Sequence, residues 1–401
     1  MLMNLFAGNV RWLRVFKLIY LPLVVLLSTA VQALDYDYLV YVGTYTGKGS
    51  EGIYAFRFDS TSGESRSIGL ASPADNPSFL TIDPKGRFLY AVNEVNTFHN
   101  EPTGAVSVFL IDRASGKLDL LQQLSSLGAG PAHVSLDRSS RYLMVANYDG
   151  GNVAVFPIGN DGRLGPHTAL VQDMGSSVNP ERQAGPHAHS IQVTNDNRFA
   201  MVADLGIDKL MMYKFDGNTG SLASGSTKFY KFDPGSGPRH LAVAPSGRFV
   251  YVVNELASTV TVFAYDAGFG TLRRKQTLST VPEKFAGKNT AAEISADTKG
   301  RFLYVSNRGD DSIVVFSISP DNGSLMFVER VPSGGKTPRH FAIDPTGKWL
   351  FAANQDSDNV QFFQVDASSG RLTPATRPFK VVSPVCVGIL RIERFDSRGT
   401  P

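Results

Sequence analysis

The chain has 401 residues and a formal net charge of +3, from 39 lysines and arginines and 36 aspartates and glutamates. A balance this close to neutral gives no electrostatic reason to expect a nucleic-acid partner. The 38 glycines and 22 prolines indicate many turns and favour an all-β fold, and the single cysteine, Cys386, excludes an intramolecular disulfide.

The first 33 residues differ from the rest of the chain. They hold three basic residues and no acidic one, and they continue with the apolar run 18–27 and with small residues that end at Ala33. This order is typical of a secretory signal peptide, so we expect cleavage after Ala33 and an exported body, periplasmic or secreted. The alternative, an uncleaved anchor, has only about ten to thirteen apolar residues, interrupted by Pro22, where roughly 20 are needed to span a bilayer. We therefore expect no stable membrane insertion after cleavage, one domain over 34–395, and a C-terminal tail over 396–401.

The first two strands of the body are expected at 38–44 and 52–58. Between them, Gly47 to Gly52 fits the G-x-G-x-x-G pattern of dinucleotide-binding loops. That pattern holds a phosphate only where a helix begins next, and here another strand follows. We therefore interpret these glycines as a hairpin turn.

A repeat of four short strands occupies the chain from there on. Each of six units begins with a proline or small residue and an apolar strand, followed by a polar turn and a strand that is led by Arg or Lys and rich in aromatics. The clearest units are at 238–251 and 338–351. The third strand of each unit carries an aromatic residue: Phe109, Phe156, Tyr213, Phe263, Phe316 and Phe363. Four antiparallel strands repeating roughly every 50 residues are typical of propeller blades.

A seventh unit is divided between the two ends of the chain. Strands 38–44 and 52–58, with Phe56 at the aromatic position, lack a first strand, and 384–390 supplies one from the other end. Pairing the two ends within one sheet closes the ring and removes an exposed edge. We predict an all-β fold, a seven-bladed β-propeller with four antiparallel strands per blade, whose N- and C-terminal strands share one blade.

One face of such a ring carries residues that vary from blade to blade. Because neighbouring strands of a blade run antiparallel, the segment that enters each first strand lies on the same face as the segment that leaves each second strand. The turns between first and second strands, such as 83–87 and 245–248, lie on the opposite face. Their residues recur from unit to unit because they suit a tight turn. Because first strands line the channel, the varied polar groups should meet at one mouth as an acid/base and anion-binding pocket. The candidates beside first strands are His133, His187, His189, Arg239, His240, Glu293, Arg339 and His340, and those after second strands are Glu94, Asn147, Asp204, Glu255, Arg308 and Gln355.

Each candidate also has a purely structural interpretation. An Arg or Glu at a strand end can be solvated or can pair between blades, and a single His is more often structural than catalytic. The number of such groups on one face favours a site. The catalytic candidates are Glu255, His187, His189, Arg239 and Arg308. The candidates for substrate binding are Glu94, Asn147, His240, Glu293 and Arg339, although Arg339, like His133, can also serve only to join blades.

Four segments resemble those of a known family. They are Gly185-Pro186-His187-Ala188-His189-Ser190, Gly237-Pro238-Arg239-His240, Val253-Asn254-Glu255-Leu256 and Ser306-Asn307-Arg308-Gly309. They are similar to segments of the lactonase β-propeller family, which includes bacterial 6-phosphogluconolactonases and the fungal carboxy-muconate lactonising enzyme. In the lactonising branch the proposed site is a His, two Arg and a Glu. By motif these fall on His187 or His189, Arg239, Arg308 and Glu255, and the motif does not choose between the two histidines.

The resemblance implies an enzyme that opens a small-molecule sugar lactone. An arginine would stabilise the oxyanion or hold a substrate anion, while Glu255 or one histidine takes a proton from water. An exported location puts a phosphorylated substrate in question, because phosphate esters are cytoplasmic metabolites, so an unphosphorylated sugar lactone is also a candidate. The alternatives are a lactonising enzyme running the reaction in reverse and a non-catalytic, ligand-binding propeller.

Metal use is a further alternative, because other propeller lactonases hold calcium in the channel. Here the acidic groups alternate with arginines, and the chain has no Cys/His spacing of the zinc type. We expect no metal and no other cofactor. The sequence assigns no oligomeric state.

Overall fold

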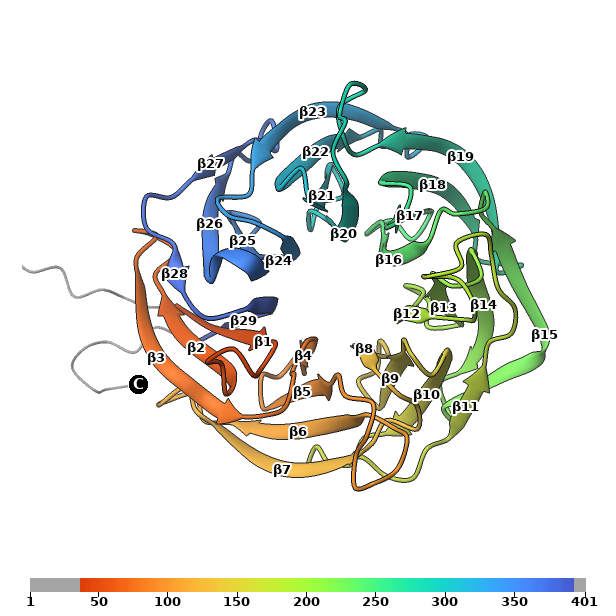
Figure 1. Cartoon of the computed structure of the whole chain (residues 1–401), viewed down its shortest axis with the longest axis horizontal. Coiled ribbons are helices and arrows are strands. Elements are labelled where there is room, and N and C mark those ends of the chain that lie inside the picture. The colour runs from red at the N-terminus through yellow and green to blue at the C-terminus, as the bar shows by residue number, and fades with distance from the viewer. Residues whose placement is uncertain (1–36, 393–401) are drawn as a thin grey trace, which may run out of the picture. The chain divides into compact units, whose positions relative to one another are not determined.

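Seven antiparallel sheets are arranged radially around a central channel (Figure 1). The structure, a computed structural model, describes residues 37–392. Six of the sheets have four strands in sequence order from the channel outwards, one of them with an additional short strand at its outer side, and the seventh combines strands from both ends of the described chain. The predicted seven-bladed β-propeller is therefore confirmed.

The blades follow one another along the chain, with the innermost strand first. The first blade contains β4 (Leu80–Ile82), β5 (Phe88–Asn93), β6 (Ala105–Ile111) and β7 (Leu118–Ser125). The second contains β8 (Pro131–Leu136), β9 (Tyr142–Asn147), β10 (Asn152–Pro157) and β11 (Ala169–Gln172). The third contains β12 (Ala188–Val193), β13 (Phe199–Asp204), β14 (Lys209–Asp216) and β15 (Ser221–Lys231).

The remaining blades keep this order. The fourth contains β16 (Pro238–Val243), β17 (Phe249–Asn254), β18 (Thr259–Asp266) and β19 (Thr271–Ser279). The fifth contains β20 (Thr290–Ala296), β21 (Phe302–Arg308), β22 (Ser312–Ile318) and β23 (Leu325–Pro332). The sixth contains β24 (Pro338–Ile343), β25 (Trp349–Asn354), β26 (Asn359–Val365) and β27 (Leu372–Pro374), and β28 (Phe379–Lys380) also pairs with β26.

The seventh blade joins the two ends of the described chain. Its order is β29 (Pro384–Arg391), β1 (Tyr38–Thr44), β2 (Gly52–Phe58) and β3 (Ser65–Pro73). β1 pairs with β29 from Tyr38 opposite Arg391 to Thr44 opposite Pro384. The predicted closure of the ring by both chain ends is confirmed, and the glycines at 47–52 do form the β1–β2 connection.

The core lies between neighbouring blades. The third-strand aromatics, Phe56, Phe109, Phe156, Tyr213, Phe263, Phe316 and Phe363, are all buried. Phe263 of β18, for example, packs against Tyr230 and Phe232 at ring-centroid distances of 4.7 and 5.8 Å. Aromatic side chains repeat here because each one fills the wedge that opens between two twisted sheets.

The turns at the face opposite the predicted site are held by aspartates. The carboxylate of Asp344 accepts backbone N–H groups of Lys348 and Trp349, each at 2.7 Å, and Asp83 accepts the N–H of Phe88 at 2.6 Å. These segments recur because they satisfy the backbone of a tight turn.

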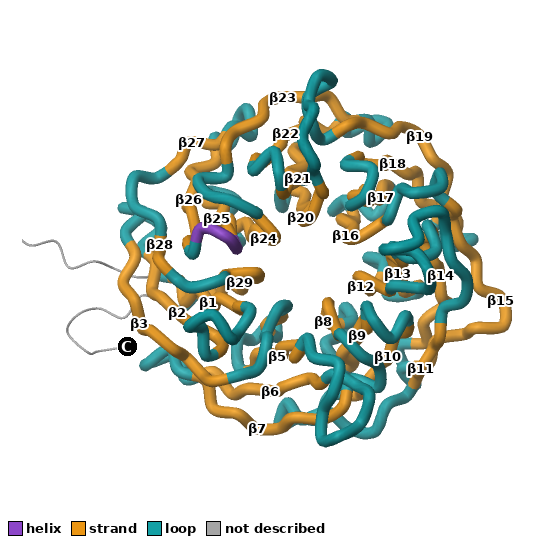
Figure 2. Tube along the Cα trace, viewed as in Figure 1, coloured by secondary structure: helices purple, strands orange, loops and turns teal. Residues whose placement is uncertain are grey.

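The described chain is almost wholly strands and loops, with one short 3-10 helix, η1 (Gln355–Ser357), as Figure 2 shows. Within residues 37–392 no helix is long and apolar enough to cross a membrane. The predicted signal peptide at 1–33 and the predicted tail at 396–401 lie outside the described residues, so the domain limits 34–395 stay a prediction.

Candidate active site

A β-bulge at the start of most first strands turns side chains toward the channel. In β16, Pro238 pairs with Asn254 and His240 with Val253, so Arg239 is an extra residue with no partner on β17. The same irregularity makes His189 the extra residue in β12 and Arg339 the extra residue in β24. A bulge re-aims side chains locally, and here it places three polar groups in one upper layer of the channel.

Glu255 is the centre of this layer. It follows β17, and its backbone is held between blades because its N–H donates to Gly237 O at 2.7 Å and its carbonyl accepts from Ala291 N at 3.2 Å. Its buried carboxylate meets four cationic or ionisable groups. They are Arg182 Nη2 at 2.8 Å from Oε1, and Arg308 Nη2 at 3.0 Å, Arg239 Nε at 3.1 Å and His189 Nε2 at 3.9 Å from Oε2.

These charges fix the protonation states of the site. Burial alone would raise the pKa of Glu255, but the charges of Arg308, Arg239 and Arg182 outweigh it and hold this pKa well below its ordinary value. Burial, and after it the charge of Arg239, lowers the pKa of His189 well below its ordinary value. At neutral pH the site therefore contains a carboxylate anion beside a neutral imidazole.

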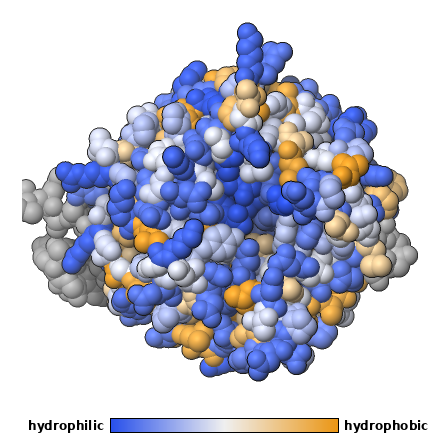
Figure 3. Space-filling view, in the orientation of Figure 1, coloured by the Kyte–Doolittle hydropathy of each residue, from blue (hydrophilic) through white to orange (hydrophobic). Residues whose placement is uncertain are grey.

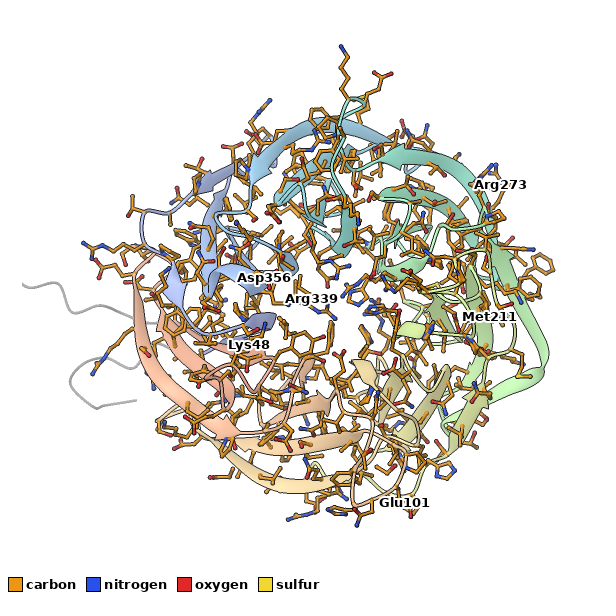
Figure 4. All side chains as sticks on the ribbon, viewed as in Figure 1. Lys48, Glu101, Met211, Arg273, Arg339 and Asp356 are labelled. Carbon is orange, nitrogen blue, oxygen red and sulfur yellow. The ribbon has the colours of Figure 1, made fainter. Side chains whose placement is uncertain are left out.

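A pocket of about 340 Å³ opens above this cluster at the mouth of the channel. It is lined by Glu94, Ala132, Tyr148, Arg182, His189, Glu255, Thr290, Arg308 and Arg339. Figure 3 shows a hydrophilic surface at the centre of this face, and Figure 4 shows the side chain of Arg339 directed into the ring. Of the residues predicted to meet at one mouth, the structure brings Glu94, His189, Glu255, Arg308 and Arg339 to this pocket.

A second polar layer lies deeper in the channel. His240 Nδ1 lies 2.8 Å from Glu293 Oε2, and His340 Nε2 lies 3.5 Å from the same oxygen. Phe79 packs against His133, His240 and His340 at ring-centroid distances of 4.3, 5.6 and 5.4 Å. None of these residues lines the pocket.

Two other predicted residues lie apart from Glu255. Asn147 is buried, and its amide donates to Ser126 O at 2.9 Å, in the connection between β7 and β8, and to Asn152 Oδ1 at 2.7 Å in its own blade. His187 stacks on Tyr148 at a centroid distance of 4.4 Å, and its Nδ1 lies 2.9 Å from the carbonyl oxygen of Tyr148. Of the two neighbouring histidines, the structure places His189 against the carboxylate of Glu255.

Three residues of the site were not predicted from the sequence. Tyr148 directly follows Asn147, just as Glu255 follows Asn254, so a strict comparison of the second-strand ends would have found it. Tyr45 donates to both oxygens of Glu94 at 3.0 Å, and Arg339 lies over its ring at 5.2 Å. The third residue, Arg182, lies in a loop with no counterpart in the repeat, and the only signal for it is the unusual length of that loop.

Arg182 and His187 belong to this loop, between β11 and β12, which a pair of buried aspartates holds in place. Asp204 Oδ1 accepts the backbone N–H groups of His187 at 2.8 Å and Gly206 at 2.9 Å. The carboxyl groups of Asp173 and Asp204 interact electrostatically with each other, and Asp173 also accepts the hydroxyl of Tyr213. Burial raises the pKa of both aspartates, and the neighbouring charge of Asp173 raises that of Asp204 further, so the folded structure favours the protonated form of the pair.

Within the described residues, no group of three or more His, Cys, Asp and Glu side chains is arranged to hold a metal ion. The chemistry that the site offers is that of a buried carboxylate, a neutral imidazole and several guanidinium groups around a small polar pocket. This combination suits proton transfer to and from an uncharged or anionic small molecule.

The fold and site define a propeller whose channel mouth forms a small-molecule pocket, and comparison with known proteins places the chain in one family. The family described as "Lactonase, 7-bladed beta-propeller" matches residues 39–389. A 6-phosphogluconolactonase of Bacillus subtilis is 37% identical over 302 residues, which cover 75% of this chain and 84% of that protein. A 6-phosphogluconolactonase of Formosa agariphila is 33% identical over 312 residues, with the same shares of the two chains.

A solved structure supports the same assignment. The periplasmic gluconolactonase of Pseudomonas aeruginosa is 36% identical, with a TM-score of 0.81 over 89% of this chain and 99% of that chain. The chain therefore belongs to the lactonase seven-bladed β-propeller family, as the sequence motifs implied.

Proposed function

We propose that this protein is a hydrolase that opens a sugar lactone in the pocket above Glu255. The observation that carries the proposal is the contact of the Glu255 carboxylate with Arg239, Arg308 and His189 at the floor of a polar pocket. The names of relatives at 33 to 37% identity support it, since they describe 6-phosphogluconolactonases and a gluconolactonase.

The geometry gives each residue a proposed role. Glu255 accepts the proton of the attacking water, and Arg308, which lines the pocket, stabilises the charge that develops on the lactone carbonyl oxygen. Arg239 does not line the pocket, and its Nη1 donates to Ala292 O at 2.8 Å, so its proposed role is to hold Glu255 in position rather than to contact the substrate. Neutral His189 lies beside the carboxylate and is the histidine we propose for the site.

The test is hydrolysis of glucono-δ-lactone and of its 6-phosphate ester by purified protein, measured against the spontaneous rate. We expect Glu255→Gln to lower kcat/KM by roughly 10²- to 10⁴-fold, because the amide cannot accept the proton. The matched control is Glu283→Gln, on an exposed loop, which should leave the rate unchanged. Equal rates for wild type, Glu255→Gln and buffer would contradict the proposal. The ratio of the two substrates shows whether phosphate is required.

We also propose that the protein works outside the cytoplasm, with residues 1–33 as a cleaved signal peptide. The basic and apolar order of these residues supports this, as does the periplasmic location given for the Pseudomonas aeruginosa relative. Expression of the full chain in a Gram-negative host should yield a periplasmic protein whose first residue is Leu34. A cytoplasmic protein that retains Met1 would contradict the proposal.

A further inference from the structure

Among the described arginines of the site, Arg182 is the one carried by a loop rather than by a strand. Its Nη2 donates to Glu255 Oε1 at 2.8 Å and to the hydroxyl of Tyr148 at 3.0 Å. Its side chain is 38% exposed, whereas those of Arg239 and Arg308 are 3% and 12% exposed. Of the three arginines that contact Glu255, Arg182 is therefore the most accessible to a molecule entering the pocket.

The backbone beneath Arg182 is fixed, so only its side chain needs to move. The turn around it is closed by a hydrogen bond from Gln183 N to Asn179 O at 2.7 Å. Gln183 is fully buried, and its amide donates to Leu205 O at 2.8 Å. A rotation of the guanidinium thus leaves the loop in place.

The other two arginines contact the backbone of the protein as well as the carboxylate of Glu255. Arg239 donates to Ala292 O at 2.8 Å, and Arg308 Nη2 lies 3.4 Å from Ala291 O, so both are attached to the backbone of β20 as well as to Glu255. Their shortest contacts with Glu255 are to Oε2, whereas the contact of Arg182 is to Oε1. The two oxygens of Glu255 therefore differ, and the partner of Oε1 is the one that can leave.

We infer that Arg182 is a catalytic residue that transfers its hydrogen bond from Glu255 to the carbonyl oxygen of the lactone. This inference rests on the proposed lactone hydrolysis. One rotation of the side chain has two effects: it exposes a lone pair on Oε1 beside the attacking water, and it brings a charged donor to the oxygen where negative charge develops. Substrate binding and activation of the base are thereby coupled.

The chemical step balances with the groups already present. The water oxygen forms a bond to the carbonyl carbon while Oε1 of Glu255 takes one water proton, and the carbonyl oxygen becomes an oxyanion held by Arg182 and Arg308. The oxyanion then collapses, the bond from the carbonyl carbon to the ring oxygen breaks, and the ring oxygen takes the proton back from Glu255. The product is the open-chain hydroxy acid, and no other reactant is consumed.

The charged and titratable groups around Glu255 come from several elements. Arg182 comes from the β11–β12 loop, His189 from β12, Arg239 and His240 from β16, Arg308 from β21 and Arg339 from β24, and Tyr148 follows β9. Removing Arg182 leaves the other cations in place. The Glu255 carboxylate should therefore keep its position in the site, and its pKa should lie nearer to its ordinary value.

The experiment measures kcat/KM for glucono-δ-lactone from pH 2 to 8 with wild type, Arg182→Met, Arg182→Lys and the control Arg273→Met. Arg273 is exposed on β19 at the outer rim of the ring, as Figure 4 shows, so this control removes a charge far from the pocket. We expect Arg182→Met to lose about 10²-fold in kcat/KM and to show an acid limb at higher pH than wild type, because kcat/KM follows the pKa of the free enzyme. Arg182→Lys should keep the wild-type acid limb and recover part of the rate, since lysine retains the positive charge but lacks the planar set of donors of a guanidinium. Arg273→Met should match wild type.

Each result decides between distinct conclusions. An unchanged kcat/KM in Arg182→Met would overturn the inference. A loss of rate with an unmoved acid limb would also overturn it, since Arg182 would then act on the substrate without acting on Glu255. If the wild type itself does not exceed the spontaneous rate, the proposed function fails and the inference fails with it, a result that is seen before any variant is examined.

Discussion

At the scale of single residues, the site depends on charges that are buried together. Glu255 remains an anion only because three arginines surround it, and an isolated buried carboxylate would take up a proton. The Asp173–Asp204 pair behaves in the opposite way, because burial is the largest influence on both carboxyl groups and raises the pKa of each. Burial with cations therefore lowers the pKa of Glu255, whereas burial of two carboxyl groups together raises the pKa of Asp173 and of Asp204.

The Asp173–Asp204 pair should make stability depend on pH. Unfolded aspartates have a pKa near 3.9, and burial raises the pKa of both in the folded state, so the folded state binds more protons above pH 4. The stability contributed by the pair is complete below about pH 4 and falls as the pH rises through the folded pKa. The loss is about 1.4 kcal/mol for each pH unit by which the folded pKa exceeds the unfolded one. In Asp204→Asn the amide should accept the same backbone N–H groups and donate to Asp173 at every pH.

We therefore expect Asp204→Asn to match wild type in free energy of unfolding near pH 4 and to exceed it by about 1 kcal/mol or more at pH 8. Urea unfolding across this range measures the difference. Asp321→Asn, on an exposed turn, is the control and should show no such trend. A difference between Asp204→Asn and wild type that stays constant with pH would show that the pKa of the pair is not raised in the folded state.

At the scale of strands and loops, the structure explains which features were predictable. Strand positions and the buried aromatics such as Phe263 repeat because every blade packs against its neighbours in the same way. Such a repeat can be recognised in a single sequence. The mouth of the channel was predicted less accurately. Asn147 was chosen where the next residue, Tyr148, lines the pocket, because an error of one residue at a strand end sends the side chain elsewhere. Arg182 lies in a loop without periodicity, so its position depends on tertiary contacts that no pattern reveals.

The innermost strand of the seventh blade, β29, offers a test at this scale. It covers β1, whose residues are all buried, and it carries Val385, Cys386 and Val387, which are also buried. We expect a chain that ends at Ser383 to lose cooperative thermal unfolding and to aggregate, because both a core layer and the pairing edge of β1 become exposed. Circular dichroism and size-exclusion chromatography measure this.

A synthetic peptide of residues 384–392 provides the control for the shortened chain. Added during refolding, it should restore a monomer-sized, cooperatively unfolding species, since it supplies the missing strand without the covalent link. A shortened chain that unfolds at the wild-type temperature without peptide would show that β29 is dispensable.

At the scale of the whole ring, the two faces have different tasks. One face presents short turns closed by aspartates such as Asp83 and Asp344, which hold the backbone and vary little. The other face gathers side chains from at least five blades around Glu255, so no single blade contains the site. The pocket therefore exists only when the ring is assembled.

The sheet that joins both chain ends also sets an order of events during synthesis. A ribosome releases residues 38–58 long before residues 384–391, so the earliest strands made remain without their inner neighbour until translation is almost finished. A secretion channel admits only an unfolded polypeptide. For the export proposed above, a propeller that closes only when β29 has been made would stay open, and able to pass through such a channel, until its last strand is synthesised.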